Sequence, residues 1–106
     1  MNQFENIAVD EFHQIIGDNN YWIIDIRDKE QFQEKHVQNA ISIPLENIEH
    51  GYFWLPPQKE VIVYCERGGS SIIAARILQK KGYRVKTLVG GIQAYWQWIE
   101  NGNKFS

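Results

Sequence analysis

The sequence has a single cysteine, three prolines and no long apolar run in its 106 residues. One cysteine excludes an internal disulfide and any metal site built from several cysteines. No apolar stretch approaches the roughly 20 residues that a membrane-spanning helix requires, so no membrane association is expected. Residues 1–20 hold no Lys or Arg, which argues against a secretory signal peptide.

Charge of either sign is also limited. There are 11 Lys and Arg and 13 Asp and Glu, the formal net charge is -2, and no basic block occurs. This composition argues against a nucleic-acid partner. The hydrophobic fraction of 43% is ordinary for a soluble globular protein, and the length suits one domain. We therefore expect residues 1–106 to form a single domain in a reducing, cytoplasmic setting.

The cysteine lies in the most informative stretch, residues 61–78, which reads VIVYCERGGSSIIAARIL. The β-branched and aromatic residues at 61–64 predict a strand buried on both faces. From Ile72 onward, apolar residues at helical spacing predict a helix, and Gly82 is expected to end it. Cys65 therefore stands at the carboxyl end of a strand, and residues 66–71 turn the chain into a helix.

This loop has the composition of an anion-binding site. Gly68 and Gly69 allow successive amides to point inward, and the helix start adds unpaired N–H groups and partial positive charge. Ser70 and Ser71 can cap the helix or donate into the same concavity. Such surroundings favour the thiolate form of a cysteine, which is the nucleophile. A lone cysteine is more often an inert core residue, but the loop that follows Cys65 favours a reactive one.

The rest of the chain alternates strands with helices. Strands are expected at 4–7, 21–24, 40–43 and 85–88, helices at 9–16, 29–34 and 92–100, and a single helical turn at 45–48. This alternation predicts an α/β fold with a central, mostly parallel five-stranded sheet and helices on both faces. Sites in such sheets gather at the carboxyl ends of the strands, where Asp25 and Cys65 both stand.

Two aromatic-rich segments accompany these elements. Tyr95, Trp96 and Ile99 share one face of the last predicted helix, and an aromatic stripe at helical spacing is usually core. The loop 50–58 either packs on the core in the same way or lines the rim of a site. His13 is expected on the solvated surface of the first helix.

Four segments together are similar to the rhodanese family. They are the apolar strand with Asp-x-Arg at 22–27, the segment at 34–44 that resembles Gly-His-Ile-x-Gly-Ala-x-Asn-Ile-Pro, the cysteine loop at 64–71, and the segment at 88–95 that resembles Gly-Gly-x-x-Ala-Trp. They occur in the family's order, at similar spacing, and span nearly the whole chain. The sequence thus resembles a single-domain rhodanese, which implies a rhodanese-like fold.

The departures from the family pattern are few. Lys35 and Asn39 stand where the family has glycines, which concerns the local backbone. Tyr95 replaces the usual Trp as a core exchange. Many members carry Arg at the sixth loop position, where this chain has Ser70, and the basic residue of this loop is Arg67 instead. This exchange in the loop bears on substrate choice and not on the presence of the site.

The resemblance implies a thiosulfate sulfurtransferase that needs no cofactor and no metal. The Cys65 thiolate would take the outer sulfur of thiosulfate, or of a similar small anionic donor, and carry it as a persulfide. The loop that would bind substrate and persulfide consists of Glu66, Arg67, Gly68, Gly69, Ser70 and Ser71. With no second cysteine, the acceptor must be external: cyanide in an assay, and a small thiol or a protein thiol in the cell. Arg67 either attracts the anionic donor or is simply an exposed loop residue.

Asp25 and Arg27 are possible supporting residues. Asp25 either orients the loop by hydrogen bonds or, as we favour, organises the turn after its strand. Arg27 is expected to pair with Glu30 or Glu34. His36 is expected to be structural, because no second His lies at ligand spacing.

Other functions fit parts of the sequence. A phosphatase or an arsenate reductase of related fold needs Cys, five residues and then Arg to grip an oxyanion, and Ser71 at that position argues against both. A non-catalytic interaction module, or a persulfide carrier for one partner, would use the same scaffold, since fold does not fix function. Retention of Cys65 in a glycine-rich loop favours an enzyme.

Overall fold

The structure is a computed structural model that describes residues 4–103. Residues 1–3 and 104–106 of the predicted single domain lie outside the described part. The strands are β1 (Glu5–Ile7), β2 (Tyr21–Asp25), β3 (Ile41–Ser42), β4 (Glu60–Tyr64) and β5 (Val85–Leu88). The helices are α1 (Val9–Ile15), α2 (Lys29–Glu34), α3 (Leu45–His50), α4 (Ser70–Lys80) and α5 (Gly91–Asn103).

The five strands form one sheet in the order β1-β5-β4-β2-β3. Each neighbouring pair is parallel, which confirms the predicted α/β class and its five-stranded sheet. The predicted edge strand at the start of the chain is β1, at one end of the sheet. The central strand β4 carries Cys65 just beyond its carboxyl end.

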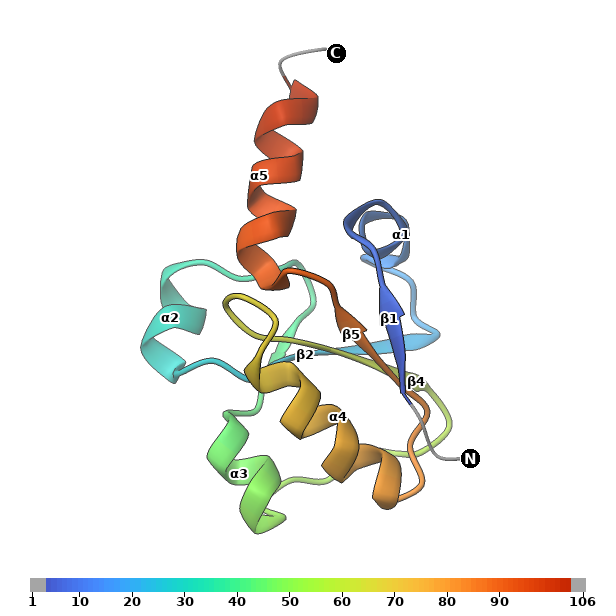
Figure 1. The fold of residues 1–106 in the computed structure, drawn as a ribbon. Coiled ribbons are helices and arrows are strands. Elements are labelled where there is room, and N and C mark those ends of the chain that lie inside the picture. The colour runs from blue at the N-terminus through green and yellow to red at the C-terminus, as the bar shows by residue number, and fades with distance from the viewer. Residues whose placement is uncertain (1–3, 104–106) are drawn as a thin grey trace.

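Alternation of side chains along β4 divides the core into two layers. Val61, Val63 and Cys65 face the layer that contains α3 and α4, while Ile62 and Tyr64 face the layer of α1 and α5. Figure 1 shows these two pairs of helices on opposite sides of the sheet. Because successive side chains of a strand point to opposite faces, the side chain of Cys65 is directed to the side of α4.

The order of the strands marks where a ligand would bind. The chain leaves β2 through α2 towards β3, but it leaves β4 through α4 in the opposite direction, towards β5. Open parallel sheets bind ligands outside the carboxyl ends of two strands that diverge in this way. Asp25 and Tyr64 are register partners at these ends, and the N–H of Ile26 donates to the Tyr64 carbonyl at 3.1 Å. Cys65 is thus placed at this divergence.

Several boundaries differ from the expected ones. Helix α4 begins at Ser70, ahead of the predicted start at Ile72. Helix α5 continues through Gly102 to Asn103, because glycine weakens a helix without forbidding it. Strand β3 is limited to Ile41–Ser42. The helical turn predicted at 45–48 is longer than expected, since α3 runs to His50.

The aromatic residues behave in two ways. Tyr95 is buried and packs edge-on against the Phe12 ring at a centroid distance of 5.1 Å, which confirms the predicted core position. His13 is exposed as expected, but its Nδ1 lies 2.8 Å from the Tyr95 hydroxyl and so links α1 to α5. In the loop after α3, Tyr52 and Trp54 are 72% and 78% exposed, so these two rings do not pack on the core.

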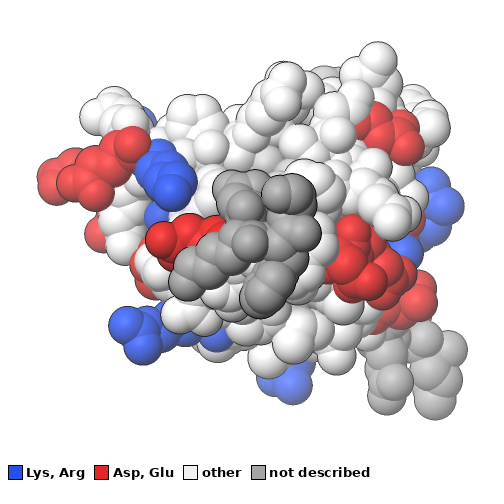
Figure 2. All heavy atoms as spheres, turned by 90° about the horizontal axis from the view of Figure 1, so that it is seen from above, with Lys and Arg blue, Asp and Glu red and all other residues white. Residues whose placement is uncertain are grey.

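The surface carries charges of both signs. Figure 2 shows the molecule from the side to which the carboxyl end of α5 points, and acidic and basic side chains are interspersed on that face. Within residues 4–103, no helix is both long and apolar enough to span a bilayer. Over the same residues, no group of three or more His, Cys, Asp or Glu side chains is arranged to hold a metal ion.

Candidate functional site

The Sγ atom of Cys65 lies in a loop of inward-pointing amides between β4 and α4. The N–H of Gly68 donates to this sulfur at 3.1 Å and the N–H of Ser71 at 3.3 Å. Cys65 itself is only 5% exposed. N–H groups aimed at one atom stabilise negative charge on it. The geometry is therefore suited to an anionic sulfur.

The shape of this loop depends on Gly68 and Ser71. Gly68 has a φ of 100°, a conformation that residues with a side chain rarely adopt. Ser71 is fully buried, and its hydroxyl donates to the Gly68 carbonyl at 3.3 Å. Ser71 also lies in the first turn of α4, so one of the helix's free amides is the one that reaches the sulfur. Gly69 and Ser70 complete the turn on the exposed side.

The first amides of α5 hold the other side of the loop. The N–H of Ile92 donates to the Cys65 carbonyl at 2.9 Å, and the N–H of Gln93 donates to the Glu66 carbonyl at 3.1 Å. Gly91 has a φ of 69°, and a β-carbon there would lie 2.5 Å from the Glu66 carbonyl oxygen. The helix start therefore binds the loop backbone, and a glycine is required at the point of closest approach.

Arg27 does not pair with Glu30 or Glu34, so that prediction is wrong. Its guanidinium forms ion pairs with Asp25 at 2.7 Å and with Glu66 at 3.1 Å. The prediction considered only carboxylates a few residues away, whereas Glu66 lies 39 residues later in the chain. Arg27 thus connects the end of β2 directly to the cysteine loop.

Asp25 is completely buried beneath this connection. Its Oδ1 accepts the backbone N–H of Arg27 at 2.9 Å, so it organises the turn after β2, as we favoured. Burial alone would lower the pKa of Arg27, but the hydrogen bonds and charge of Asp25 raise that pKa above its usual range. Burial, together with Asp25, also raises the pKa of Tyr64, which keeps its phenol neutral. Asp25 is connected to the cysteine loop through Arg27, which pairs with both Asp25 and Glu66.

The other predicted polar residues are placed at the margin. Arg67 is exposed, and none of the ion pairs among the described residues involves it. His36 is exposed as well, with its Nδ1 2.7 Å from the Phe32 carbonyl and its ring stacked on the Phe32 ring. These contacts with Phe32 agree with the structural role that the sequence predicts for His36.

Gln93 and the precise role of Gly91 escape the sequence analysis. The side-chain amide of Gln93 donates to the Glu66 carboxylate, so it belongs to the surroundings of the loop. Gly91 falls in the Gly-Gly motif, which was a usable signal, although the motif does not say which loop it contacts. Gln93 carries no such signal, because its partner comes from a distant part of the sequence.

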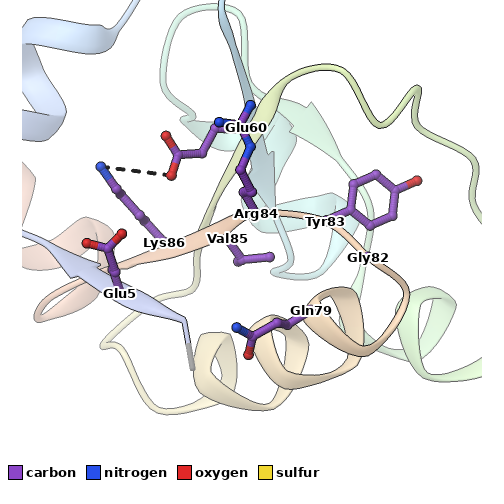
Figure 3. A pocket seen from close by; sticks show the side chains of 8 residues that line it. All are labelled: Glu5, Glu60, Gln79, Gly82, Tyr83, Arg84, Val85 and Lys86. Atoms are coloured by element: carbon purple, nitrogen blue, oxygen red, sulfur yellow. Dashed lines mark ion pairs between the residues drawn. The ribbon is translucent and has the colours of Figure 1, made fainter. Parts of the chain in front are cut away.

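A separate cavity of about 520 Å³ lies at the amino ends of the strands, opposite the end that carries Cys65 (Figure 3). Its lining comes from the amino ends of strands, including Glu5, Glu60 and Val85, and from the end of α4. An ion pair of 3.9 Å joins Lys86 to Glu60 at this edge. Since Cys65 follows the carboxyl end of β4, this cavity is not part of the cysteine site.

Residues 8–97 of the sequence match the family model of the rhodanese-like domain. The chain belongs to this family. Thiosulfate sulfurtransferase PspE from Escherichia coli is 40% identical over 75 residues, which cover 69% of this chain and 71% of that protein. A rhodanese homolog from Thermus thermophilus superposes with a TM-score of 0.73 at 27% identity, over 86% of this chain and all of that one. Family and fold are thereby established.

The rhodanese-like domain also occurs within longer proteins. A tRNA sulfurtransferase from Desulfurococcus amylolyticus is 33% identical over 91 residues, or 86% of this chain. Those residues make up only 18% of that relative. The match therefore concerns one part of a larger protein, while the match to PspE extends over most of both sequences.

Proposed function

We propose that this rhodanese-like chain is a sulfurtransferase that moves a sulfane sulfur from thiosulfate, or a similar small anionic donor, to an external thiophilic acceptor. The observation that carries the proposal is the pair of N–H groups, from Gly68 and Ser71, that converge on the Cys65 sulfur. The names of the sulfurtransferase relatives support the same reaction class. Cys65 is the nucleophile in this proposal, and residues 66–71 bind the transferred sulfur.

The reaction has two steps. In the first, the Cys65 thiolate attacks the outer sulfur of thiosulfate, the sulfur–sulfur bond of the donor breaks, and sulfite leaves with the bonding electron pair. The resulting persulfide carries its negative charge on the terminal sulfur, where the loop amides can stabilise it. In the second, the acceptor's lone pair attacks that terminal sulfur and the Cys65 thiolate is released. Cyanide becomes thiocyanate, and a thiolate acceptor becomes a new persulfide.

A reducing compartment such as the cytoplasm suits this proposal, because Cys65 must remain a free thiolate between cycles. The acceptor comes from outside the chain, since Cys65 is its only cysteine. A small thiol and a protein thiol both meet that requirement. Neither a nucleic acid nor a membrane is needed at any step, and no cofactor or metal enters.

The competing functions have less support in the geometry. Phosphoryl chemistry in a loop of this kind uses a guanidinium fork at the position of Ser71, whose short hydroxyl donates to the Gly68 carbonyl instead. A non-catalytic module has no use for amides aimed at a sulfur. A persulfide carrier would share the first step and differ in the second, through rapid transfer to one protein partner.

Intact-mass measurement tests the proposal directly. Brief exposure to thiosulfate should add the mass of one sulfur atom, because the terminal sulfur is held by the loop amides. Cyanide should then remove that mass with formation of thiocyanate. A chain that gains no sulfur from thiosulfate, polysulfides or mercaptopyruvate would contradict the proposed function and leave the interaction module as the explanation.

Arg67→Gln should weaken donor binding without affecting the chemical step. Loss of an exposed positive charge near the sulfur should raise KM for thiosulfate about two- to fivefold at low salt, with kcat unchanged. Steady-state kinetics at two ionic strengths would measure this effect, which should shrink at high salt. Arg84→Gln is the matched control, because Arg84 is also exposed but lines the cavity at the amino ends of the strands, away from Cys65. An equal change in both variants would refute a local role for Arg67.

A further inference from the structure

Glu66 is held from two directions by side chains of different elements. Nη1 of Arg27, which follows β2, lies 3.1 Å from Oε1 of Glu66. The side-chain amide of Gln93, in the first turn of α5, donates to Oε2 of the same carboxylate. The backbone carbonyl of Glu66 also accepts the N–H of Gln93. The residue directly after the cysteine is therefore fixed through both its side chain and its backbone.

The support behind this arrangement is buried and hydrogen-bonded. Arg27 is 9% exposed, and the same guanidinium is paired with the fully buried Asp25. Nη2 of Arg27 additionally donates to the Lys35 carbonyl at 2.6 Å, at the end of α2. Glu66, whose side chain is 34% exposed, is the outermost member of the network. It thus transmits the position of the buried Asp25–Arg27 pair to the loop.

A carboxylate is an unfavourable choice next to an anionic sulfur. Asp25, Arg27 and Glu66 together sum to one negative charge, and a like charge nearby disfavours an anion. A cavity of about 480 Å³ between α2 and α5 is lined by Arg27, Glu66 and Gln93 as well as by Trp96. The Glu66 side chain is 34% exposed, and solvent screening of its charge reduces the penalty without removing it. The presence of Glu66 is explained by what it holds in place.

We propose that Glu66 is a positioning residue that fixes the Cys65 loop through Arg27 and Gln93, and that its charge favours sulfur donors with less negative charge than thiosulfate. The proposal rests on the proposed sulfurtransferase function for its kinetic consequences. The positioning role itself requires no sulfur transfer. Two substitutions separate the two roles: Glu66→Ala removes the contacts and the charge, whereas Glu66→Gln removes only the charge.

Hydrogen exchange of the loop amides tests the positioning role independently of activity. In Glu66→Ala, the amides of Gly68 and Ser71 should exchange about tenfold faster, because charge-assisted hydrogen bonds that hold the loop are lost. Glu66→Gln should exchange more slowly than Glu66→Ala, since its amide can still accept from Arg27 and a rotated Gln93 can meet it, although these bonds no longer have the assistance of the charge. Glu34→Ala is the matched control, because Glu34 lines the same cavity, and none of the ion pairs among residues 4–103 joins it to the loop.

Kinetics with thiosulfate and cyanide test the consequence for transfer. Glu66→Ala and Gln93→Ala should each lower kcat about tenfold, and the double variant should lose no more than the larger single effect, because the two residues act as one unit. Glu66→Gln should lower kcat less than Glu66→Ala does, and it should lower KM for thiosulfate about two- to threefold at low salt.

The outcomes distinguish this proposal from the function on which it rests. Unchanged loop exchange in both Glu66→Ala and Gln93→Ala overturns the positioning role, whatever the activity. Faster loop exchange in a chain that never gains sulfur supports the positioning role and contradicts the sulfurtransferase function. Equal values of KM for thiosulfate in the parent and in Glu66→Gln overturn the effect of charge on donor choice.

Discussion

Cys65→Ser is expected to lose sulfur transfer by at least about a thousandfold, because serine is not ionised at neutral pH and cannot form a persulfide. The fold should persist. The serine hydroxyl can accept the two amides that now point at the sulfur, so the free energy of unfolding should stay within about 1 kcal/mol of the parent. Thiocyanate formation and circular dichroism, measured on the same preparation, would test both expectations.

Cys65→Ala is a second variant that separates loss of the nucleophile from loss of the hydrogen-bond acceptor. Cys65→Ala removes the acceptor for the amides of Gly68 and Ser71, whereas Cys65→Ser keeps one. Both should be inactive, and only the alanine variant should show altered exchange of these amides. Transfer that survives in either folded variant would rule out Cys65 as the nucleophile.

Gly91→Ala should be the most damaging change outside the loop itself. Its β-carbon would lie 2.5 Å from the Glu66 carbonyl oxygen, and the residue has a φ of 69°. The combined strain should lower the free energy of unfolding by about 2–4 kcal/mol. The displaced loop should slow persulfide formation about a hundredfold, since transfer needs the sulfur and the amides in register. Urea denaturation and single-turnover mass measurement would report the two effects.

Gly69→Ala is the matched control for this experiment. Gly69 belongs to the cysteine loop but has a φ of -78°, and a β-carbon there would meet nothing within 4 Å. Its stability should equal that of the parent or exceed it slightly, because alanine restricts the unfolded chain. If Gly91→Ala were as stable and as active as Gly69→Ala, the close contact between α5 and the loop would have no importance for the site.

Local sequence signals were sufficient for the centre of the molecule. An apolar run, a cysteine, small residues and a helical pattern follow one another between Val61 and Leu78, and each adopts the predicted conformation with a shift of the helix start to Ser70. The parallel sheet follows from the alternation of strands and helices, because parallel strands need a crossover between them. Nothing in these inferences depends on contacts between distant segments.

Long-range partners were the part that the sequence could not provide. Arg27 had several carboxylates nearby in the chain, and spacing alone pointed to Glu30 or Glu34. The fold instead brings Glu66 to Arg27 from the cysteine loop, and it brings Gln93 to Glu66 from the last helix. Such a choice depends on the order of strands in the sheet, which places the end of β2 beside the end of β4. A family motif marked Gly91, but only the structure shows what it touches.

The contact between α5 and the cysteine loop has a consequence for how the protein is made. During translation, Cys65 emerges before the residues of α5, whose first amides fix the loop carbonyls. Strand β1 likewise cannot pair until β5 has been synthesised, since Glu5, Asn6 and Ile7 pair with residues 86–88. A nascent chain that stops short of Gly91 therefore has the amides of Gly68 and Ser71 but lacks the helix that fixes the backbone of their loop. We expect the sulfur-binding geometry to become fixed only once synthesis has passed the last helix.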